Sequence, residues 1–432
     1  MSSESHNDAM KWSSLAVHGN DDDLEDVYGY KPGGYHPVHI DDDLDSGRYR
    51  VLHKFGYGGS STVWLCRDTS YNTPTYVAVK IIAAELTEES CHELDMDRHM
   101  RELGVDRQPE AHLLCFPLRD FRQTGPNGTH ICIVYPVLGP PLHLAMETFK
   151  DKFSQDDCAR IVRGLVRQVA SGIALLHANG ICHGDLRPPN VLLRLESLEG
   201  LTTSEVYDIV GEPEAAEVVA KDSSGAPVLV PGIPQYLVYP IERVKPDHLS
   251  RQISITDFGE AFNHSTEGER LTGIPRPYSA PELVFDKKGG LAADLWALAC
   301  LAFETRLGGK IIEPCDIMGP DDTEYLLAVI LFLGRLPDKW WDTWDTRDEF
   351  IARSNGGTHS RLELRVENWG EREEERSIDE KARGQCRYDG ELWDISQSEV
   401  EVMSKLLEQL LQYEPEKRLA AQDAVNHEWF RM

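Results

Sequence analysis

An aspartate and an asparagine in one short stretch could handle a hydroxyl proton and a metal ion. Positions 183–190 read His-Gly-Asp-Leu-Arg-Pro-Pro-Asn. The carboxylate of Asp185 can accept a proton from a hydroxyl group, and the amide oxygen of Asn190 can ligate Mg2+. A second acidic ligand, Asp257, opens the run Asp-Phe-Gly, and Ala-Pro-Glu follows at positions 280–282. Singly, Asp257 could be a turn residue and Asn190 a cap. In this order, the motifs indicate phosphoryl transfer.

A glycine-rich turn precedes these motifs. Positions 56–63 read Gly-Tyr-Gly-Gly-Ser-Ser-Thr-Val. Gly56 and Gly58, with Tyr57 between them, would let a backbone lie close to phosphate oxygens. Alone, the pattern favours an ordinary glycine-rich hairpin over a phosphate-binding turn.

A lysine follows in an apolar strand. Positions 77–80 read Val-Ala-Val-Lys, and burying Lys80 is costly unless its charge is matched. Nucleotide phosphates and a helix glutamate would match it. Glu93 is our choice for that glutamate, because it lies in the first predicted helix. The alternatives left open are Glu85, Glu88 and Glu89, or a lysine that reaches outward from an edge strand.

The elements that would position these residues form a small β-rich part followed by a large helical part, an α+β fold. Strands are predicted at 49–54, 62–67, 76–82 and 130–137, with a helix near 88–103. Apolar residues recur at three and four positions over 155–178, which predicts a long helix. Runs at 190–195 and 252–258 predict a strand pair that brackets an insertion at about 196–250, which is too long for an ordinary loop.

The composition excludes several classes of protein. The 432 residues are 41% hydrophobic and 27% charged, which is typical of soluble globular proteins. A formal charge of -29 argues against direct nucleic-acid binding and suits a cationic partner. The polar, acidic start and the absence of a long apolar run predict neither a secretory signal nor a membrane span. We expect the protein in the cytoplasm and nucleus.

We expect residues 1–47 to form a mostly flexible acidic tail, because they contain too few apolar residues to form a core. The spacing of Asp41, Asp43 and Asp45 resembles a calcium loop, but Ser46 stands where glycine is required. The nine cysteines form no CxxC pair, which argues against a zinc site and a disulfide framework. They are expected to be reduced and mostly buried.

Together the motifs resemble the SR-protein kinases, most closely their fungal members. The resemblance spans 33–430 and includes Gly-Gly-Tyr-His-Pro-Val at 33–38, Ser-Thr-Val-Trp-Leu at 61–65 and Val-Leu-Gly at 137–139. It implies a eukaryotic protein kinase fold. The small antiparallel N-lobe would span 48–138 and carry one main helix, and the helical C-lobe would span 139–432 and include the insertion. The implied activity is transfer of the ATP γ-phosphate, with Mg2+, to serines of basic Arg/Ser-rich splicing factors by a monomer.

The resemblance also assigns roles residue by residue. Asp185 would orient the substrate hydroxyl as the base, with Arg187 beside it. Asn190 and Asp257 would hold magnesium, and Lys80 would hold the α- and β-phosphates. Adenine would lie between Val63 and Ala78 on one side and Leu192 on the other, with backbone bonds around Val137 and Leu138 and with Tyr135 behind it. Asp294 would brace the catalytic loop, and Arg418 would pair with Glu282.

One position departs from the pattern of most kinases, and two more depart from the pattern of the resembling family. Gly184 stands where most kinases carry an arginine that reads an activation-loop phosphate, so activity without that phosphorylation is expected. Arg187 replaces a lysine beside the γ-phosphate, and a guanidinium does not substitute freely for an ammonium group. Pro275 replaces a threonine that bonds this lysine and the base. The alternative function is therefore an ATP-binding pseudokinase or scaffold with weak or no transfer.

Substrate docking is also open at the sequence level. The family's docking groove uses acids before Gly334, where Asp322 and Glu324 lie, but Leu331 stands where the family has an acid. The acidic run at 371–375 alternates with arginines and fits a solvated surface. A kinase with acidic or proline-directed targets is the third interpretation.

Overall fold

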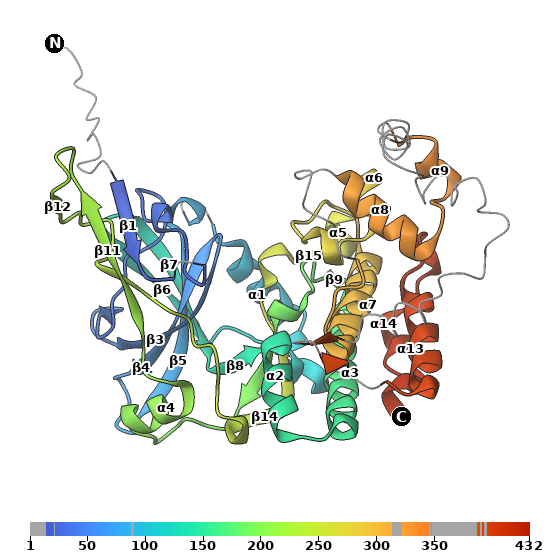
Figure 1. Cartoon of the computed structure of the whole chain (residues 1–432), viewed down its shortest axis with the longest axis horizontal. Helices are drawn as coiled ribbons and strands as arrows, with labels where there is room; N and C mark the ends of the chain where they lie inside the picture. Colours follow the sequence, from blue (N-terminus) through green and yellow to red (C-terminus); the bar gives the residue numbers. More distant parts are fainter. Residues whose placement is uncertain are drawn as a thin grey trace, which may run out of the picture. The chain divides into compact units, whose positions relative to one another are not determined.

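The computed structural model describes residues 14–20, 22–87, 90–312, 322–344, 347, 387–388, 391–392 and 395–432. Contacts within the chain divide it into two compact units (Figure 1). Unit 1 comprises 1–95, 115–140 and 194–250, and unit 2 comprises 96–114, 141–193 and 251–432.

A six-stranded antiparallel sheet, in the order β2-β3-β4-β5-β7-β6, forms the larger part of unit 1. Its strands are β2 (Asp43–Leu44), β3 (Tyr49–Gly58), β4 (Ser61–Asp68), β5 (Thr75–Ile82), β6 (Arg119–Gly125) and β7 (Gly128–Pro136). The four strands predicted from the sequence are all present. Helix α1 (His92–Glu102) follows β5, where the first helix is predicted.

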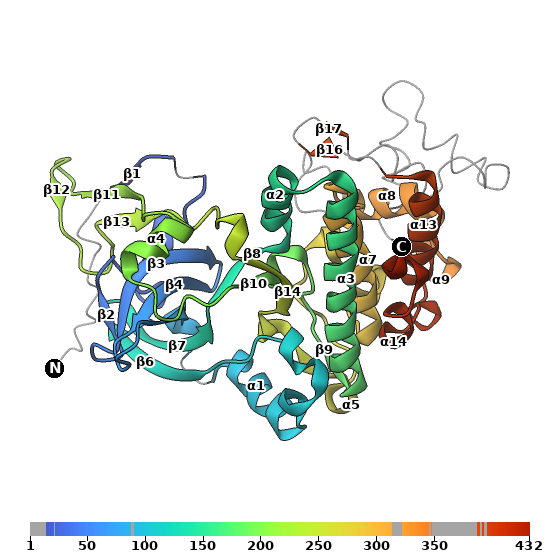
Figure 2. The ribbon, with the colours of Figure 1, turned by 90° about the horizontal axis from the view of Figure 1, so that it is seen from below.

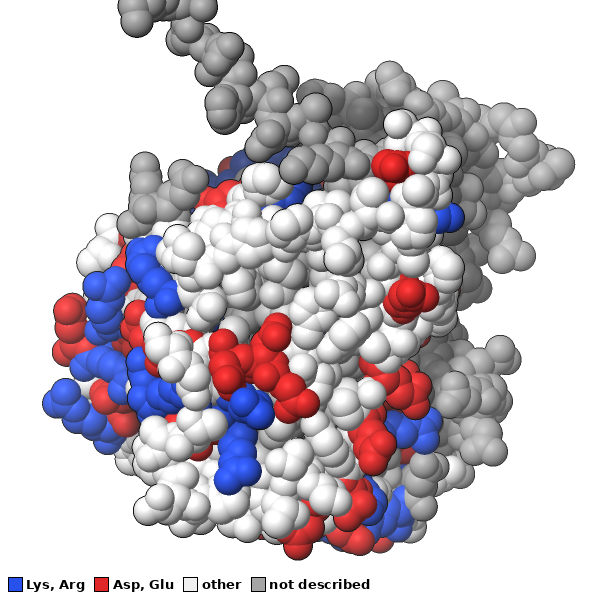
Figure 3. Space-filling view, turned by 90° about the vertical axis from the view of Figure 1, so that its left-hand side faces the viewer, with Lys and Arg blue, Asp and Glu red and all other residues white. Residues whose placement is uncertain are grey.

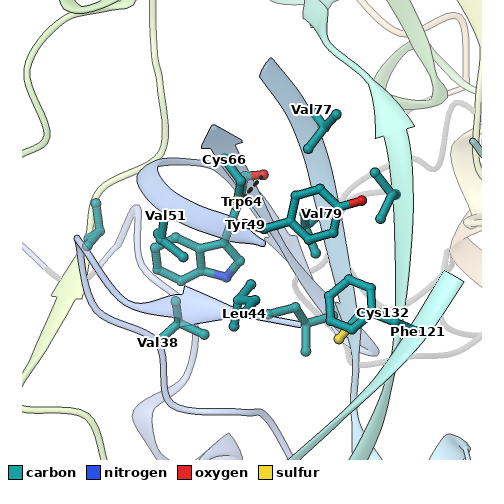
Figure 4. Packing of buried hydrophobic residues seen from close by; sticks show 13 residues of the cluster. Val38, Leu44, Tyr49, Val51, Trp64, Cys66, Val77, Val79, Phe121 and Cys132 are labelled. Carbon is teal, nitrogen blue, oxygen red and sulfur yellow. Dashed lines mark hydrogen bonds between the residues drawn. The ribbon is translucent and has the colours of Figure 1, made fainter. Parts of the chain in front are cut away.

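One face of this sheet buries the core of unit 1 (Figure 4). Val77, Val79 and Ile81 of β5 share that face, because side chains alternate along a strand. The buried cluster also contains Val38, which precedes the sheet, and Val238, which belongs to the insertion. The start of the chain and the insertion therefore complete the core of the sheet.

A second sheet of unit 1 joins these two segments directly. β1 (Ser14–His18) pairs antiparallel with β11 (Ala215–Lys221). β11 also pairs with β12 (Pro227–Val228) and with β13 (Tyr236–Val238), and α4 (Thr203–Val210) precedes it.

The structure departs here from two expectations drawn from the sequence. Residues 14–20 and 22–47 pack into unit 1 instead of forming a mostly flexible tail, because Leu24, Val27 and Tyr30 are buried against Val218 and Leu237. Residues 194–250 cluster with unit 1, whereas we expected the insertion in the C-terminal lobe.

Unit 2 is mainly helical (Figure 2). Its long helix α3 (Gln155–Ala178) matches the predicted range, and the Ser154 hydroxyl caps it by accepting a hydrogen bond from the backbone N–H of Asp157. α7 (Leu291–Leu307) is buried along most of its length and packs on α3. Further α-helices among the described residues of unit 2 are α2 (Leu142–Lys152), α5 (His264–Glu267), α6 (Pro281–Phe285), α8 (Asp322–Leu333), α9 (Asp338–Trp341), α13 (Gln397–Leu410) and α14 (Ala421–Ala424).

Short strands frame the segments that carry the chemical motifs. β9 (Ile181–Cys182) pairs with β15 (Phe262–Asn263). β10 (Val191–Leu195) lies between β14 (Leu249–Ile255) and β8 (Leu138–Pro141), so the predicted pairing of the runs before and after the insertion is confirmed. A separate pair joins β16 (Arg387–Tyr388) and β17 (Glu391–Leu392).

The seven cysteines within the described ranges are free and buried, as predicted. Burial raises the pKa of Cys115 to about 12, so its thiol is protonated at neutral pH. Cys315 and Cys386 lie outside the described residues. In the part of the chain that the structure covers, no helix combines the length and apolar character needed to cross a membrane.

Candidate active site

The stretch at 183–190 forms a loop between β9 and β10 of unit 2, and Asp185 is its buried carboxylate. The side-chain amide of Asn190 donates to Asp185 Oδ2 at 2.7 Å and to the Asp185 carbonyl at 2.8 Å. These two bonds orient the amide nitrogen toward Asp185. The amide oxygen of Asn190 is therefore the atom that could ligate a cation.

Arg187 contacts the same carboxylate. Its Nε–H donates to Asp185 Oδ1 at 3.1 Å and to Oδ2 at 3.0 Å. Burial raises the pKa of Asp185, and the charge and hydrogen bonds of Arg187 oppose that rise. Arg187 thus favours the ionised form of Asp185, which is the form that can accept a hydroxyl proton.

Asp294 braces this loop, as predicted. Its Oδ2 accepts from the backbone N–H of His183 at 2.8 Å, and its Oδ1 accepts from that of Gly184 at 3.0 Å. His177 Nε2 lies 2.9 Å from Asp294 Oδ2. Burial alone would raise the pKa of Asp294, but His177 and the backbone bonds outweigh it and hold the pKa below its usual range. An ionised Asp294 can therefore accept both backbone bonds.

Gly184 has a backbone conformation that favours glycine, with a φ of +76°. A Cβ atom at this position would lie 2.5 Å from the carbonyl oxygen of Glu260. The departure from the arginine of most kinases therefore has a local structural basis: the position is closed to a side chain.

Asp257 follows β14, which pairs with β10. The N–H and hydroxyl of the preceding Thr256 donate to the carbonyl of Asn190 at 2.9 and 3.1 Å. His183 and Phe258 are in ring contact, with centroids 5.2 Å apart. Asp257 itself has a φ of +63°, an uncommon value for a non-glycine residue that recurs at functional sites. Unit 2 thus brings the Asp257 segment against the loop of Asp185 and Asn190.

The donor atoms in this part of unit 2 fit a magnesium ion. Mg2+ prefers oxygen ligands and usually takes one or two protein side chains together with substrate phosphates and water. The carboxylate of Asp257 and the amide oxygen of Asn190 are ligands of this kind. These two residues would hold the ion.

In unit 1, Lys80 forms an ion pair on β5. Its Nζ lies 2.7 Å from Glu93 Oε2, and the hydroxyl of Tyr135 donates to Glu93 Oε1 at 2.7 Å. Among the four glutamates that the sequence left open, the structure thus pairs Glu93 with Lys80. Glu88 and Glu89 lie outside the described residues.

The glycine-rich turn is a tight hairpin in which β3 runs through Gly58 and β4 begins at Ser61. Gly56 and Gly58 each have open space where a Cβ atom would stand. No other atom therefore crowds the backbone at these two glycines, and their contact with phosphate oxygens stays a prediction. Tyr57 between them is 40% exposed.

The residues expected around adenine are divided between the units. Val63, Ala78, Tyr135, Val137 and Leu138 belong to unit 1, and Leu192 belongs to unit 2. Leu192 is partly exposed between the buried Val191 and Leu193, as alternation along β10 requires. Their contact with adenine stays a prediction.

Two contacts bear on the remaining predicted residues. Arg418 and Glu282 form a buried bidentate pair, with Nη–Oε distances of 2.6 and 2.7 Å, which confirms the predicted pairing. Asp322 accepts from Arg276 Nε at 2.6 Å, so this predicted docking acid is engaged within the chain. The side chains of Glu324 and Leu331 and the acidic run at 371–375 lie outside the described residues.

Sequence reasoning missed a buried ion pair next to the glycine-rich turn. Lys54 of β3 and Glu25 pair with each other, and both side chains are almost fully buried. A lysine in the β-rich run before the glycines was the available signal. Its partner could not be found because Glu25 belongs to an acidic cluster interpreted as part of a solvated tail.

Comparison with known proteins agrees with this geometry. The family model described as "Protein kinase domain" matches residues 49–202 and 244–430. A serine/threonine-protein kinase SRPK of Physarum polycephalum is 29% identical over 419 residues, which cover 94% of this chain and 91% of that protein. SRSF protein kinase 3 of Homo sapiens is 25% identical over an alignment that covers 95% of this chain and 91% of that protein.

The family match leaves out only residues 203–243 between its two segments, within the predicted insertion. The predicted kinase fold, the predicted enzyme class of protein serine/threonine kinase and the predicted resemblance to the SR-protein kinases are confirmed. The chain belongs to the protein kinase family.

Proposed function

We propose that this kinase transfers the γ-phosphate of ATP to serines of basic, Arg/Ser-rich proteins of the splicing-factor type. The observation that carries the proposal is the buried carboxylate of Asp185, which Arg187 and Asn190 hold through side-chain hydrogen bonds. A carboxylate fixed in this way can orient a hydroxyl group and accept its proton.

The other residues have complementary roles in this proposal. Lys80, oriented by Glu93, binds the α- and β-phosphates, and the open backbone of Gly56 and Gly58 lies along the phosphate chain. Asn190 and Asp257 hold magnesium. The ion neutralises charge on the phosphates when it is bound. The protein thus contributes positioning and charge neutralisation more than covalent chemistry.

The substrate class rests on two observations. The similar proteins carry the names SRPK and SRSF protein kinase, and the formal charge of -29 suits a basic partner. The negative charge is not distributed evenly over the surface. The face in Figure 3 carries residues of both signs around a broad uncharged area. Recognition of basic segments would therefore depend on local groups of acids.

A peptide series tests the proposal. The full chain is incubated with radiolabelled ATP, Mg2+ and an Arg/Ser repeat peptide, beside a peptide of equal length and charge in which lysine replaces arginine and a neutral serine peptide. We expect the Arg/Ser peptide to be phosphorylated with the highest kcat/KM. Incorporation no greater than that of an Asp185→Ala variant would reject the proposal, and preference for an acidic or proline-containing peptide would reject its substrate class.

A second candidate, an ATP-binding scaffold with little or no transfer, is favoured by Arg187 and Pro275, which together alter a hydrogen-bond network of the family. It predicts thermal stabilisation by ATP that Lys80→Ala removes, without phosphate incorporation. Incorporation that depends on Asp185 would exclude it.

We further propose that activity does not require a phosphate on the activation loop, because glycine at position 184 has no side chain that could bind that phosphate. Phosphatase treatment of the purified protein should leave kcat unchanged. Loss of turnover after treatment would contradict this.

A further inference from the structure

The glycine-rich turn is tied to a segment that precedes the kinase sheet. The hydroxyl of Tyr35 donates to the carbonyl of Gly58 at 2.7 Å. Gly58 is the last residue of β3, and the carbonyl of Ser60, beyond it, accepts from the N–H of Ala83 at 2.9 Å. The turn is thus held both by the segment that follows β5 and by the Tyr35 side chain, which comes from outside the sheet.

Tyr35 is itself fixed in place. Its N–H donates to the carbonyl of Gly29 at 3.0 Å, and its own carbonyl accepts from the side-chain amide of Asn127 at 2.7 Å. Its ring meets the ring of Tyr30 edge-on, with centroids 5.5 Å apart. Because backbone and ring are both held, the hydroxyl can act as a fixed donor to the turn.

The residues before Tyr35 are anchored to the segment that follows β5. The carbonyls of Gly33 and Gly34 accept from the N–H groups of Glu85 and Ala84 at 2.7 and 3.1 Å. A Cβ atom on Gly34 would lie 2.0 Å from the carbonyl oxygen of Gly29. The close return of the chain at this point therefore requires glycine.

A buried ion pair joins the same segment to β3. Glu25 pairs with Lys54, and the hydroxyl of Tyr30 donates to Glu25 Oε1 at 2.6 Å. The Lys54 ammonium also lies 5.3 Å from the ring centre of Tyr57, which is the residue between the two glycines of the turn. Removing one partner of such a buried pair leaves an uncompensated charge, so the pair fixes the segment against the strand.

From these contacts we propose that residues 24–35 form a brace that holds the glycine-rich turn in its nucleotide-binding position, with Tyr35 as the positioning residue. The inference rests on the proposed function, since it assigns the braced turn to ATP. A turn that is already ordered loses less conformational entropy when the phosphates bind. Loss of the Tyr35 hydroxyl should therefore weaken ATP binding and leave peptide binding unchanged.

The test compares Tyr35→Phe with a matched control, Tyr207→Phe. The hydroxyl of Tyr207 donates to the carbonyl of Leu52 at 3.0 Å, so the control loses the same atom and the same kind of bond on the same strand, away from the turn. The Kd for ATP with Mg2+ is measured by titration calorimetry on the full chain, together with KM for ATP and for an Arg/Ser peptide. Melting temperatures report folding.

We expect Tyr35→Phe to weaken ATP binding about threefold to tenfold, the range for one lost hydrogen bond, with KM for the peptide unchanged. Tyr207→Phe should bind ATP like the wild type. Unchanged ATP affinity in Tyr35→Phe, or an equal loss in both variants, would overturn the brace.

The two proposals fail in different ways. A wild type that binds ATP without transferring phosphate would overturn the proposed function, and the comparison of ATP affinities would still decide on the brace. A wild type that does not bind ATP would overturn both. Transfer by the wild type with equal ATP affinity in all three proteins would overturn the brace alone.

Discussion

Arg187 donates its Nε–H to both carboxylate oxygens of Asp185, at 3.1 and 3.0 Å. The contact joins the residue that departs from the family's lysine to the expected catalytic base. Lysine would supply a mobile point charge here, whereas arginine has a planar group that holds the carboxylate from one side. The substitution therefore preserves a positive charge at the base and changes its geometry.

Replacing Arg187 by alanine should lower kcat by about 10²-fold, because a preorganised charge is lost at the reacting group. Arg187→Lys should retain kcat to within about tenfold, since it keeps the charge and loses the fixed geometry. Steady-state kinetics with the Arg/Ser peptide measure both. Equal rates in the alanine variant and the wild type would show that Arg187 takes no part in transfer.

The same contact sets the pH dependence. Burial raises the pKa of Asp185 and Arg187 opposes the rise, so Arg187→Ala should raise that pKa further. Because the base must be ionised, the acid limb of the profile of kcat/KM against pH should move to higher pH in the variant. An acid limb at the same pH in both proteins would contradict the assigned role of Asp185 or its coupling to Arg187.

Glu93→Ala should lower kcat/KM for ATP about 10- to 100-fold, the range for a lost hydrogen bond to a charged group. The reason is that Glu93 holds Lys80 at 2.7 Å. Tyr135→Phe removes the other hydrogen bond of Glu93 and leaves the Lys80 ion pair intact, so its loss should be smaller. If the two variants lost equal amounts, the orienting role of Glu93 toward Lys80 would be wrong.

Gly184→Ala should destabilise the fold by about 1–3 kcal/mol, because the position has a positive φ and its Cβ would meet the Glu260 carbonyl. Gly164→Ala is the matched control. Gly164 is exposed within α3 and has open space for a Cβ, so alanine should be neutral or stabilise by about 0.5–1 kcal/mol. Urea denaturation gives both free energies of unfolding, and equal values would contradict the closed geometry at Gly184.

Buried histidines should make the stability of unit 1 depend on pH. His36 is 7% exposed and meets the His130 ring at a centroid distance of 4.8 Å. Burial lowers the pKa of His36 to about 4, whereas a histidine in the unfolded chain titrates near 6.5. Between these values the unfolded chain binds more protons. Stability should therefore fall as pH decreases from about 6.5 toward 4, by up to about 1.4 kcal/mol per unit.

The free energy of unfolding of the wild type and of His36→Phe, measured between pH 7.5 and 4.5, checks this. The variant lacks the titrating ring, so its curve should be flatter over the acidic range. Parallel curves would show that His36 does not carry the dependence.

The candidate catalytic and binding residues could be predicted from the sequence because each belongs to a short motif. Such a motif is recognised from the order of neighbouring residues alone. Lys80 lies within an apolar strand, and Asp185 and Asn190 share one loop, so no long-range contact was needed to find them. The structural role of Asp294 was predicted by resemblance. The two hydrogen bonds that it accepts from the backbone of the catalytic loop agree with that role.

The start of the chain could not be predicted in the same way. Leu15 and Val17 are too few to indicate a strand locally, and β1 forms because they pair with Ala220 and Val218 of the insertion, far away in the sequence. Glu25 was hidden among acids that suggested solvent exposure, although it is buried against Lys54. The composition of a segment gives only its average polarity. The pairing of β1 and the burial of Glu25 depend instead on which distant segment of the chain packs against them.

The central claim is that the carboxylate of Asp185 accepts or orients the proton of the substrate hydroxyl. The most direct measurement compares wild type and Asp185→Asn in single-turnover transfer from ATP to the Arg/Ser peptide, with ATP affinity measured separately. The account predicts transfer about 10²- to 10⁴-fold slower in the variant, with nearly unchanged ATP affinity. Transfer at the wild-type rate by a folded Asp185→Asn variant would contradict it.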